Sequence, residues 1–427
     1  MPIAAWRGLG RRLAAHPLAR VGPGLITGVA DDDPSGIATY SQAGAQFGLN
    51  MLWTMPLTFP LMAAVQSICG RIGRVTGSGL AYNIRRSFPI WVAISAVTLL
   101  LIANTLNIAA DVAAMGEVAS LSMGGNRHLM TGALVLVSLG LQVFVPYHRY
   151  IKVLRWLTLS LLAYAAVLFT VHVPWGEVAL RTVWPHLKLD GATATVAMGI
   201  LGTTISPYLF FWQCSEEIED MRAKKAPPLL QDPAAAGKEL RRIRWDTWSG
   251  MGYSNVTAYC VILTTALTLH AAGTTDVQTA TQAAAALRPL AGDFAFYLFS
   301  LGILGVGMVG VPVLAGSAGY AIAELMGWQW GLEAEARTAW RFYSVIAASM
   351  LVGFGLGFTA INPIKALFYS AVINGVVAVP LIVLILVLAA RSSVMGPYRA
   401  RGVMLVLGWL TAALMGVAAI GMCFPAK

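Results

Sequence analysis

Long apolar stretches separated by short polar segments run through the whole chain. Windows of about 20 apolar residues, the length that crosses the hydrocarbon core of a bilayer, recur at eleven places. They are residues 22–47, 51–71, 88–119, 129–146, 150–173, 193–217, 247–271, 292–325, 340–361, 366–390 and 402–424. The pattern predicts an all-α, polytopic membrane helix bundle that forms a single transmembrane domain over residues 1–427.

The basic residues give this bundle an orientation. With the N-terminus in the cytoplasm, the cytoplasmic side holds all but six of the 29 Lys and Arg, and the six are Arg127, Arg181, Lys188, Arg288, Lys365 and Lys427. Lys and Arg accumulate in the cytoplasmic loops of membrane proteins. We therefore expect a multi-pass protein of the cell (inner) membrane with its N-terminus in the cytoplasm and its C-terminus outside.

Composition and charge indicate which kinds of molecule the chain binds or contacts. The chain is 57% hydrophobic and 11% charged, with a mean hydropathy of +0.70. Its net charge of +10 is spread over short loops, which indicates neighbouring lipid headgroups and no nucleic acid. The four cysteines have neither disulfide nor zinc spacing, and no HExxH or GxSxG motif indicates an enzyme. We expect a monomer in the lipid bilayer, with no cofactor.

The first span contains three consecutive carboxylates and a proline, Asp31-Asp32-Asp33-Pro34. Ionisable side chains at membrane depth are energetically costly and usually mark function. Asp followed by Pro is typical of an N-cap and the first residue of a helix, so the span is predicted to break here and a half-helix to start at Pro34.

The sixth span repeats the arrangement at Ser206-Pro207, with Gly202, Thr203 and Thr204 before it. Five crossings separate the two breaks, so the sixth span enters from the opposite side. Two helices broken at corresponding positions of inverted halves indicate a secondary transporter whose substrate lies at the breaks. The halves would cover about residues 20–175 and 190–390, followed by an extra helix over about 402–424.

At each break the first half-helix ends with free carbonyl groups and the negative end of its dipole. With the Asp33 carboxylate nearby, this favours a cation, and hard oxygen ligands suit magnesium, calcium or manganese. The predicted metal ligands are Asp33, Ser206 and the Thr203 region. The alternative is that Asp33 and Ser206 serve only as helix caps.

Five further carboxylates are candidates for an ion pathway or a proton relay. Asp31 and Asp32 either line an exit path or neutralise a buried basic group. Asp111 either relays protons or pairs with a base such as Arg341. Glu216 and Glu217 form either an acidic vestibule or a solvated helix end at the cytoplasmic mouth. We expect residues 216–246 to form a cytoplasmic loop with a short surface helix.

Two motifs resemble those of the Nramp family of divalent-metal transporters. Gly22-Pro23-Gly24 followed by Asp33-Pro34 is similar to the first-helix signature, GPG followed by Asp-Pro-Gly-Asn. Gly202-Thr203 with Ser206-Pro207-Tyr208 is similar to the sixth-helix signature ending Met-Pro-His. The resemblance implies a LeuT-type fold of two inverted five-helix repeats plus one helix. It also implies that Asp33 and the Thr203 carbonyl bind metal, with Asp111 as a weaker match.

The departures from the family pattern point to a divergent branch similar to the Nramp-related magnesium transporters. The family's Asn, Met and His positions are Gly36, Ser206 and Tyr208, and Ala114 stands where a Glu is expected after Asp111. Loss of a soft thioether argues against an ordinary manganese or iron importer. Losing the His and the Glu also puts proton coupling in doubt.

The leading hypothesis is a secondary transporter that moves a hard divalent cation, magnesium or manganese, by alternating access. The alternative keeps the fold but places an organic amine or amino acid beside Asp33, in space left by Gly36 and Ser206.

Overall fold

The structure is a computed structural model that describes residues 23–145, 160–186, 190–358 and 362–423, and within these ranges all regular secondary structure is helical. In the first predicted half the helices are α2 (Pro23–Asp31), α3 (Pro34–Phe47), η2 (Gly48–Met51), α4 (Thr54–Thr76), α5 (Leu80–Ser87), α6 (Ile90–Met123), α7 (Arg127–Phe144), α9 (Leu162–Val167) and α10 (Trp175–Val183).

The second predicted half begins with α11 (Gly191–Thr204), α12 (Pro207–Ala223), η4 (Pro233–Ala235), α13 (Ala236–Thr265) and η5 (Ala266–His270). The short segments α14 (Ala280–Ala284), η6 (Ala285–Leu287), α15 (Arg288–Ala291) and η7 (Gly292–Phe294) follow. The chain then forms α16 (Ala295–Met326), α17 (Trp340–Leu356), α18 (Pro363–Ala390), α19 (Ser392–Met395), η8 (Gly396–Tyr398) and α20 (Val403–Gly421).

The predicted membrane bundle is confirmed. Among the described residues, six helices are long and apolar enough to cross a bilayer, and a bent pair over Pro34–Met51 and Thr54–Thr76 adds a seventh candidate. The shorter α17 is also apolar. The predicted span at 150–173 lies partly outside the described residues, so the number of eleven crossings stays a prediction.

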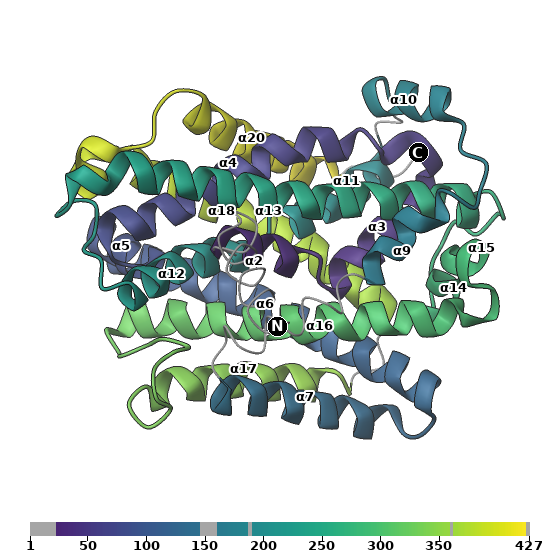
Figure 1. Ribbon diagram of the computed structural model, residues 1–427, viewed down its shortest axis with the longest axis horizontal. Coiled ribbons are helices and arrows are strands. Elements are labelled where there is room, and N and C mark those ends of the chain that lie inside the picture. The colour runs from purple at the N-terminus through teal and green to yellow at the C-terminus, as the bar shows by residue number, and fades with distance from the viewer. Residues whose placement is uncertain (1–22, 146–159, 187–189, 359–361, 424–427) are drawn as a thin grey trace, which may run out of the picture.

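Figure 1 shows the long helices α6, α13 and α16 running along the longest axis of the molecule. The short helices α10, α14 and α15 lie at one end, and α5 lies at the other. α2, α3, α11 and α12 occupy the interior, where α2 contacts α13, α3 contacts α18 and α12 contacts α4 and α16. The two interrupted helices are therefore held by neighbours from both predicted halves.

Both helix breaks occur where the sequence predicts them. α2 ends at Asp31 and α3 begins at Pro34, while α11 ends at Thr204 and α12 begins at Pro207. A proline at the first helical position lacks an N–H that would be unsatisfied there anyway, so it can start a helix but cannot continue the one before it.

Glycines bring each first half-helix close to its neighbour. A Cβ on Gly28 would collide with the Gly250 backbone of α13, and a Cβ on Gly202 would collide with the Ala371 carbonyl and Gly375 of α18. Such contacts require small residues, as in other membrane helix pairs. α2 and α11 are thus fixed by close backbone packing beside their breaks.

The expected long loop over residues 216–246 is wrong. α12 continues to Ala223, and α13 begins at Ala236, so only a short connection remains between them. Four of the basic residues in this range, Lys238, Arg241, Arg242 and Arg244, lie on the first turns of α13, where helix-favouring Lys, Glu and Arg predominate. Of these four, Arg242 faces carboxylates on α12, as described below, and the other three are exposed.

Candidate functional site

Asp33 is the carboxylate at the first break, and it is 1% exposed. Its Oδ1 accepts hydrogen bonds from the Ser35 hydroxyl at 2.6 Å and the Gly36 amide at 2.9 Å, so it caps α3 as predicted. Its Oδ2 accepts from Asn107 of α6 at 3.1 Å. One carboxylate oxygen therefore holds the helix start, while the other faces the bundle interior.

Tyr208 reaches across from the second broken helix to the first. Its hydroxyl donates to the Ala30 carbonyl at 3.1 Å and lies 3.5 Å from Asp33 Oδ2. Ala30 is in the last turn of α2, where carbonyl groups have no partner within the helix. Tyr208 thus lies beside the predicted ligand and satisfies one carbonyl at the helix end.

Ser206 lies at the predicted N-cap of α12, but its hydroxyl does not cap that helix. It donates to the carbonyls of Gly202 and Thr203, both at 2.8 Å. The capping role is therefore wrong, because the end of α11 offers carbonyl acceptors to the same hydroxyl. The Thr203 carbonyl, a predicted ligand, carries this hydrogen bond and keeps a second lone pair.

The space beside Gly36 is filled by polar side chains. A Cβ at this position would lie 3.0 Å from Thr203 Oγ1, 3.4 Å from Tyr40 Cε2 and 3.7 Å from the Asp31 carbonyl oxygen. The hydroxyls of Thr203 and Tyr40 are buried and have no partner at hydrogen-bonding geometry among the described residues. The missing side chain leaves no open space here, because both neighbours occupy it.

Asp31 and Asp32 are both buried, at 0% and 3% exposed, and they share one hydroxyl. Ser254 of α13 lies 2.5 Å from Asp31 Oδ2 and 3.0 Å from Asp32 Oδ1. The ion pairs of the described residues include neither aspartate, so the predicted pairing with a buried base is not seen there. Asp31 Oδ1 and Asp32 Oδ2 have no described partner.

Asp111 is joined to Asp33 through an amide. Asn107 Nδ2 donates to Asp111 Oδ2 at 2.9 Å as well as to Asp33, and Asn374 of α18 donates to Asn107 Oδ1 at 2.6 Å. The predicted pairing of Asp111 with Arg341 is wrong, since the Arg341 guanidinium lies over the rings of Trp328 and Trp340.

Sequence reasoning missed Asn107 and Asn374. Asn107 precedes Asp111 by one helical turn and therefore shares its face of α6, and Asn374 is an amide inside an apolar span. Both features were visible signals. Ser254 and Tyr40 carry no comparable signal, because isolated hydroxyls are common in membrane helices.

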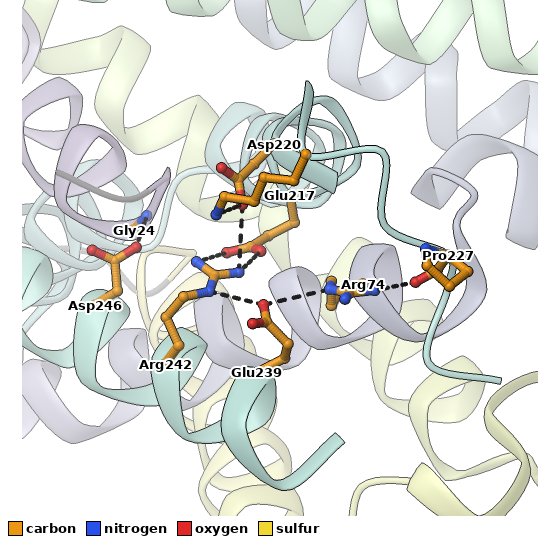
Figure 2. A network of polar contacts seen from close by, with 9 residues as sticks. Gly24, Arg74, Glu217, Asp220, Pro227, Glu239, Arg242 and Asp246 are labelled. Atoms are coloured by element: carbon orange, nitrogen blue, oxygen red, sulfur yellow. Dashed lines mark hydrogen bonds and ion pairs between the residues drawn. The ribbon is translucent and has the colours of Figure 1, made fainter. Parts of the chain in front are cut away.

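Glu216 and Glu217 form neither a solvated helix end nor an open acidic vestibule, since they are 9% and 0% exposed. Figure 2 shows why: Glu217 pairs with Arg242 of α13, with Glu217 Oε2 lying 2.5 Å from Arg242 Nη2. The Glu216 carboxylate lies 3.4 Å from the Tyr320 hydroxyl of α16. Both acids are thus drawn into contacts between helices.

The ion pairs around Arg242 form a network across three helices, α4, α12 and α13, shown in Figure 2. Arg242 also contacts Glu239 at 3.1 Å, and Glu239 lies 3.6 Å from Arg74 of α4. Burial alone would raise the pKa of Glu239, but Arg242 and Arg74 outweigh it and lower that pKa below its ordinary value. Asp246 accepts from the Gly24 amide at 2.8 Å, which attaches the start of α2 to α13.

The two breaks are closed to solvent, since Thr203 and Ser206 are each 1% exposed. A cavity of about 310 Å³ lies at the end of the molecule that carries α14 and α15, lined by residues that include Gln42, Thr195, Asp276, Lys365 and Phe368. A Cβ on Gly199 would lie 3.2 Å from Phe368 and from Thr39. The helices α3, α11 and α18 therefore pack tightly against one another just inside this cavity.

Oxygen atoms dominate the chemistry at the breaks. They come from one carboxylate of Asp33, the hydroxyls of Thr203 and Tyr40, and the carbonyls at the ends of α2 and α11. Among the described residues no group of three or more His, Cys, Asp or Glu could hold a metal ion. The arrangement suits a cation held by a single carboxylate and neutral oxygens, with water completing its ligands.

Comparison with known proteins places the chain. The profile of the Natural resistance-associated macrophage protein-like family matches residues 24–425. A divalent metal cation transporter MntH of Acidiphilium cryptum is 27% identical over 419 residues, covering 94% of this chain and 87% of that protein.

Solved structures share the fold. The Eremococcus coleocola manganese transporter, in complex with an aromatic bis-isothiourea compound, has a TM-score of 0.73 at 17% identity, covering 94% of this chain and 85% of that one. MhsT in complex with L-phenylalanine has a TM-score of 0.63 at 12% identity, covering 94% and 97%. The fold is of the LeuT type, and the chain belongs to the Nramp family.

Proposed function

We propose that this member of the Nramp family is a membrane transporter of divalent metal cations. Its substrate is a hard cation, magnesium or manganese, which binds between the α2/α3 break and the α11/α12 break. Transport occurs by alternating access, in which the two breaks open in turn to either side of the membrane. The MntH relatives and the manganese transporter of the same fold support the divalent cation as substrate.

The observation that carries the proposal is the group of unpartnered oxygens at the breaks. Among the described residues, the buried hydroxyls of Thr203 and Tyr40 make no hydrogen bond of ordinary geometry and interact only weakly with each other, next to the Asp31 carbonyl and close to the start of α3. Buried polar atoms without partners are unfavourable by about 1–3 kcal/mol each. A cation that carries some of its water satisfies such atoms directly or through the water.

The ligand types favour a hard ion. Carboxylate, hydroxyl and carbonyl oxygens suit magnesium and manganese, whereas thioether and thiolate sulfur suit softer metals. Ser206 supplies no sulfur where the family has Met, and its hydroxyl is engaged with α11. Magnesium gives up its water reluctantly, so a site with a single carboxylate and neutral oxygens fits a partly hydrated ion.

Uptake into proteoliposomes tests the proposal. Asp33→Asn keeps the helix cap, because Asn caps as well as Asp, but removes the charge. We expect both Asp33→Asn and Asp33→Ala to lose most magnesium and manganese uptake, at unchanged folding by size-exclusion chromatography. Full uptake by Asp33→Asn would contradict the proposal and leave Asp33 as a helix cap only.

Thermal unfolding of the same protein with added ligands distinguishes a metal substrate from an organic amine. The space beside Gly36, which the amine alternative requires, is filled by Thr203 and Tyr40. We therefore expect manganese and magnesium to raise the unfolding temperature of the parent more than that of Asp33→Asn, and amines or amino acids to leave it unchanged. A shift with amines alone would favour the alternative.

A further inference from the structure

Asn107 lies between two carboxylates, those of Asp33 and Asp111. Both its N–H groups are used: one donates to Asp33 Oδ2 at 3.1 Å and the other to Asp111 Oδ2 at 2.9 Å. All three side chains are at most 1% exposed. An amide that donates to two carboxylate oxygens in this geometry is well placed to orient both side chains.

Asn374 fixes the orientation of that amide. Its Nδ2 donates to Asn107 Oδ1 at 2.6 Å, from α18 in the other predicted half of the chain. A flipped Asn107 would place its carbonyl oxygen against two carboxylates and its N–H groups against another donor. Only one orientation therefore satisfies the whole chain of contacts, which connects α3, α6 and α18.

The constraint falls on one particular oxygen. Ser35 and Gly36 hold Asp33 Oδ1 at the start of α3, which leaves Oδ2 as the oxygen that faces α6 and α12. Asn107 is the nearest described donor to Oδ2, with Tyr208 at the longer distance of 3.5 Å. The amide thus determines which lone pair of Oδ2 remains available inside the bundle.

We infer that Asn107, oriented by Asn374, is a positioning residue that aims the free lone pair of Asp33 at the transported cation and couples Asp111 to the ion. This rests on the proposed function, which it deepens. In this arrangement the amides of Asn107 and Asn374, on α6 and α18, hold the carboxylate of Asp33 in its position. Asp111 then acts on the ion through Asn107 and does not ligate it.

The chain offers a matched control on the same helix. Asn104 is also fully buried on α6, one turn before Asn107, but its amide donates to the Leu314 carbonyl at 2.9 Å and to Ser317 at 2.7 Å on α16. Asn104→Ala removes an equivalent pair of buried hydrogen bonds that do not reach Asp33. It reports the structural loss alone.

The test measures manganese and magnesium binding by calorimetry, and the KM and maximal rate of uptake, on purified full-length variants. For Asn107→Ala we expect Kd and KM to rise about 10- to 100-fold, the usual effect of removing a residue that orients a metal ligand. We expect a smaller change in maximal rate. For Asn374→Ala we expect a smaller rise in Kd and KM, because this variant retains the N–H donors of Asn107.

The control distinguishes positioning from stability. Asn104→Ala should lower the unfolding temperature and leave Kd and KM within about twofold of the parent. Asn107→Ala and Asn374→Ala both binding metal as the parent does, while Asp33→Asn does not bind, would overturn the inference but keep the proposed function. Binding retained by Asp33→Asn would overturn the proposed function instead. Should Asn107→Ala fail to fold, Asn374→Ala decides the outcome alone.

Discussion

Gly36 has no side chain in the first turn after the break, and the side chains of Thr203 and Tyr40 lie beside it. The Nramp resemblance places a ligating Asn here, yet its Cβ would lie only 3.0 Å from Thr203 Oγ1 and 3.4 Å from the Tyr40 ring. In the site proposed above, hydroxyls from α11 and from further along α3 stand in for the oxygen that the resemblance places at this position. A site can keep its hard-oxygen character while changing which helix supplies the ligand.

Restoring the Asn at this position should therefore fail in isolation. We expect Gly36→Asn to lower the unfolding temperature and to reduce uptake, because adding atoms to a packed interior costs about 1–3 kcal/mol. Gly36→Asn combined with Thr203→Ala should recover much of the stability, since the closest contact is removed. Thermal unfolding of the two variants, with Thr203→Ala alone as control, checks this. A Gly36→Asn protein as stable as the parent would contradict it.

Among the elements, the half-helices were predictable and their side-chain partners were not. Asp33-Pro34 and Ser206-Pro207 locate both breaks because proline cannot continue a helix and the residue before it can cap the next one. The direction of the Ser206 hydroxyl depends instead on which carbonyls of α11 lie nearby. Similarly, Asp111 was visible as a buried acid, but its amide partner Asn107 is held in turn by Asn374, which comes from a span far along the chain.

The ion pair between Arg242 and Glu217 belongs to α12 and α13. Glu217 is fully buried, so Arg242→Ala leaves a buried acid without its ion-pair partner, a loss that destabilises by at most about 3–5 kcal/mol. Chemical unfolding in detergent should show this loss, and Glu217→Gln added to Arg242→Ala should recover most of it. Lys224→Ala breaks an exposed pair with Asp220 and should change stability by about 1 kcal/mol or less. Equal losses in both variants would contradict a buried role for the pair.

For the molecule as a whole, periodicity and charge were sufficient to predict the bundle, because membrane spans need long apolar runs whatever they pack against. The extent of α12 and α13 was predicted wrongly because the charged residues at their ends were taken to indicate a loop in solvent. A charged residue such as Arg242 indicates solvent in a sequence, yet here it lies in a helix and faces acids on another helix. Interior placement of charge depends on tertiary partners, which no local pattern contains.

The breaks lie between the cavity lined by Gln42 and Asp276 and the Arg242 network, and they are closed to solvent on both sides. Phe368 and Thr39 pack against Gly199 on the cavity side, and Asp246 holds the start of α2 on the other side. An ion can reach Asp33 only if one of these regions moves. On the side of the Arg242 network, opening requires the separation of polar contacts, so we expect it to respond to changes of charge. On the side of the cavity, opening requires the separation of packed side chains, so we expect it to respond to changes of side-chain size.

The positive-inside pattern predicts which of these ends faces the cytoplasm, and two exposed residues allow a direct test. Asp276 lines this cavity, with a side chain 52% exposed, and Lys238 is exposed near the Arg242 network. In a background lacking Cys69, Cys214, Cys260 and Cys423, a membrane-impermeant maleimide should label Asp276→Cys in intact cells and Lys238→Cys only in inverted membrane vesicles. The reverse labelling would show that Lys and Arg are concentrated outside, contrary to the rule on which the N-terminal orientation depends.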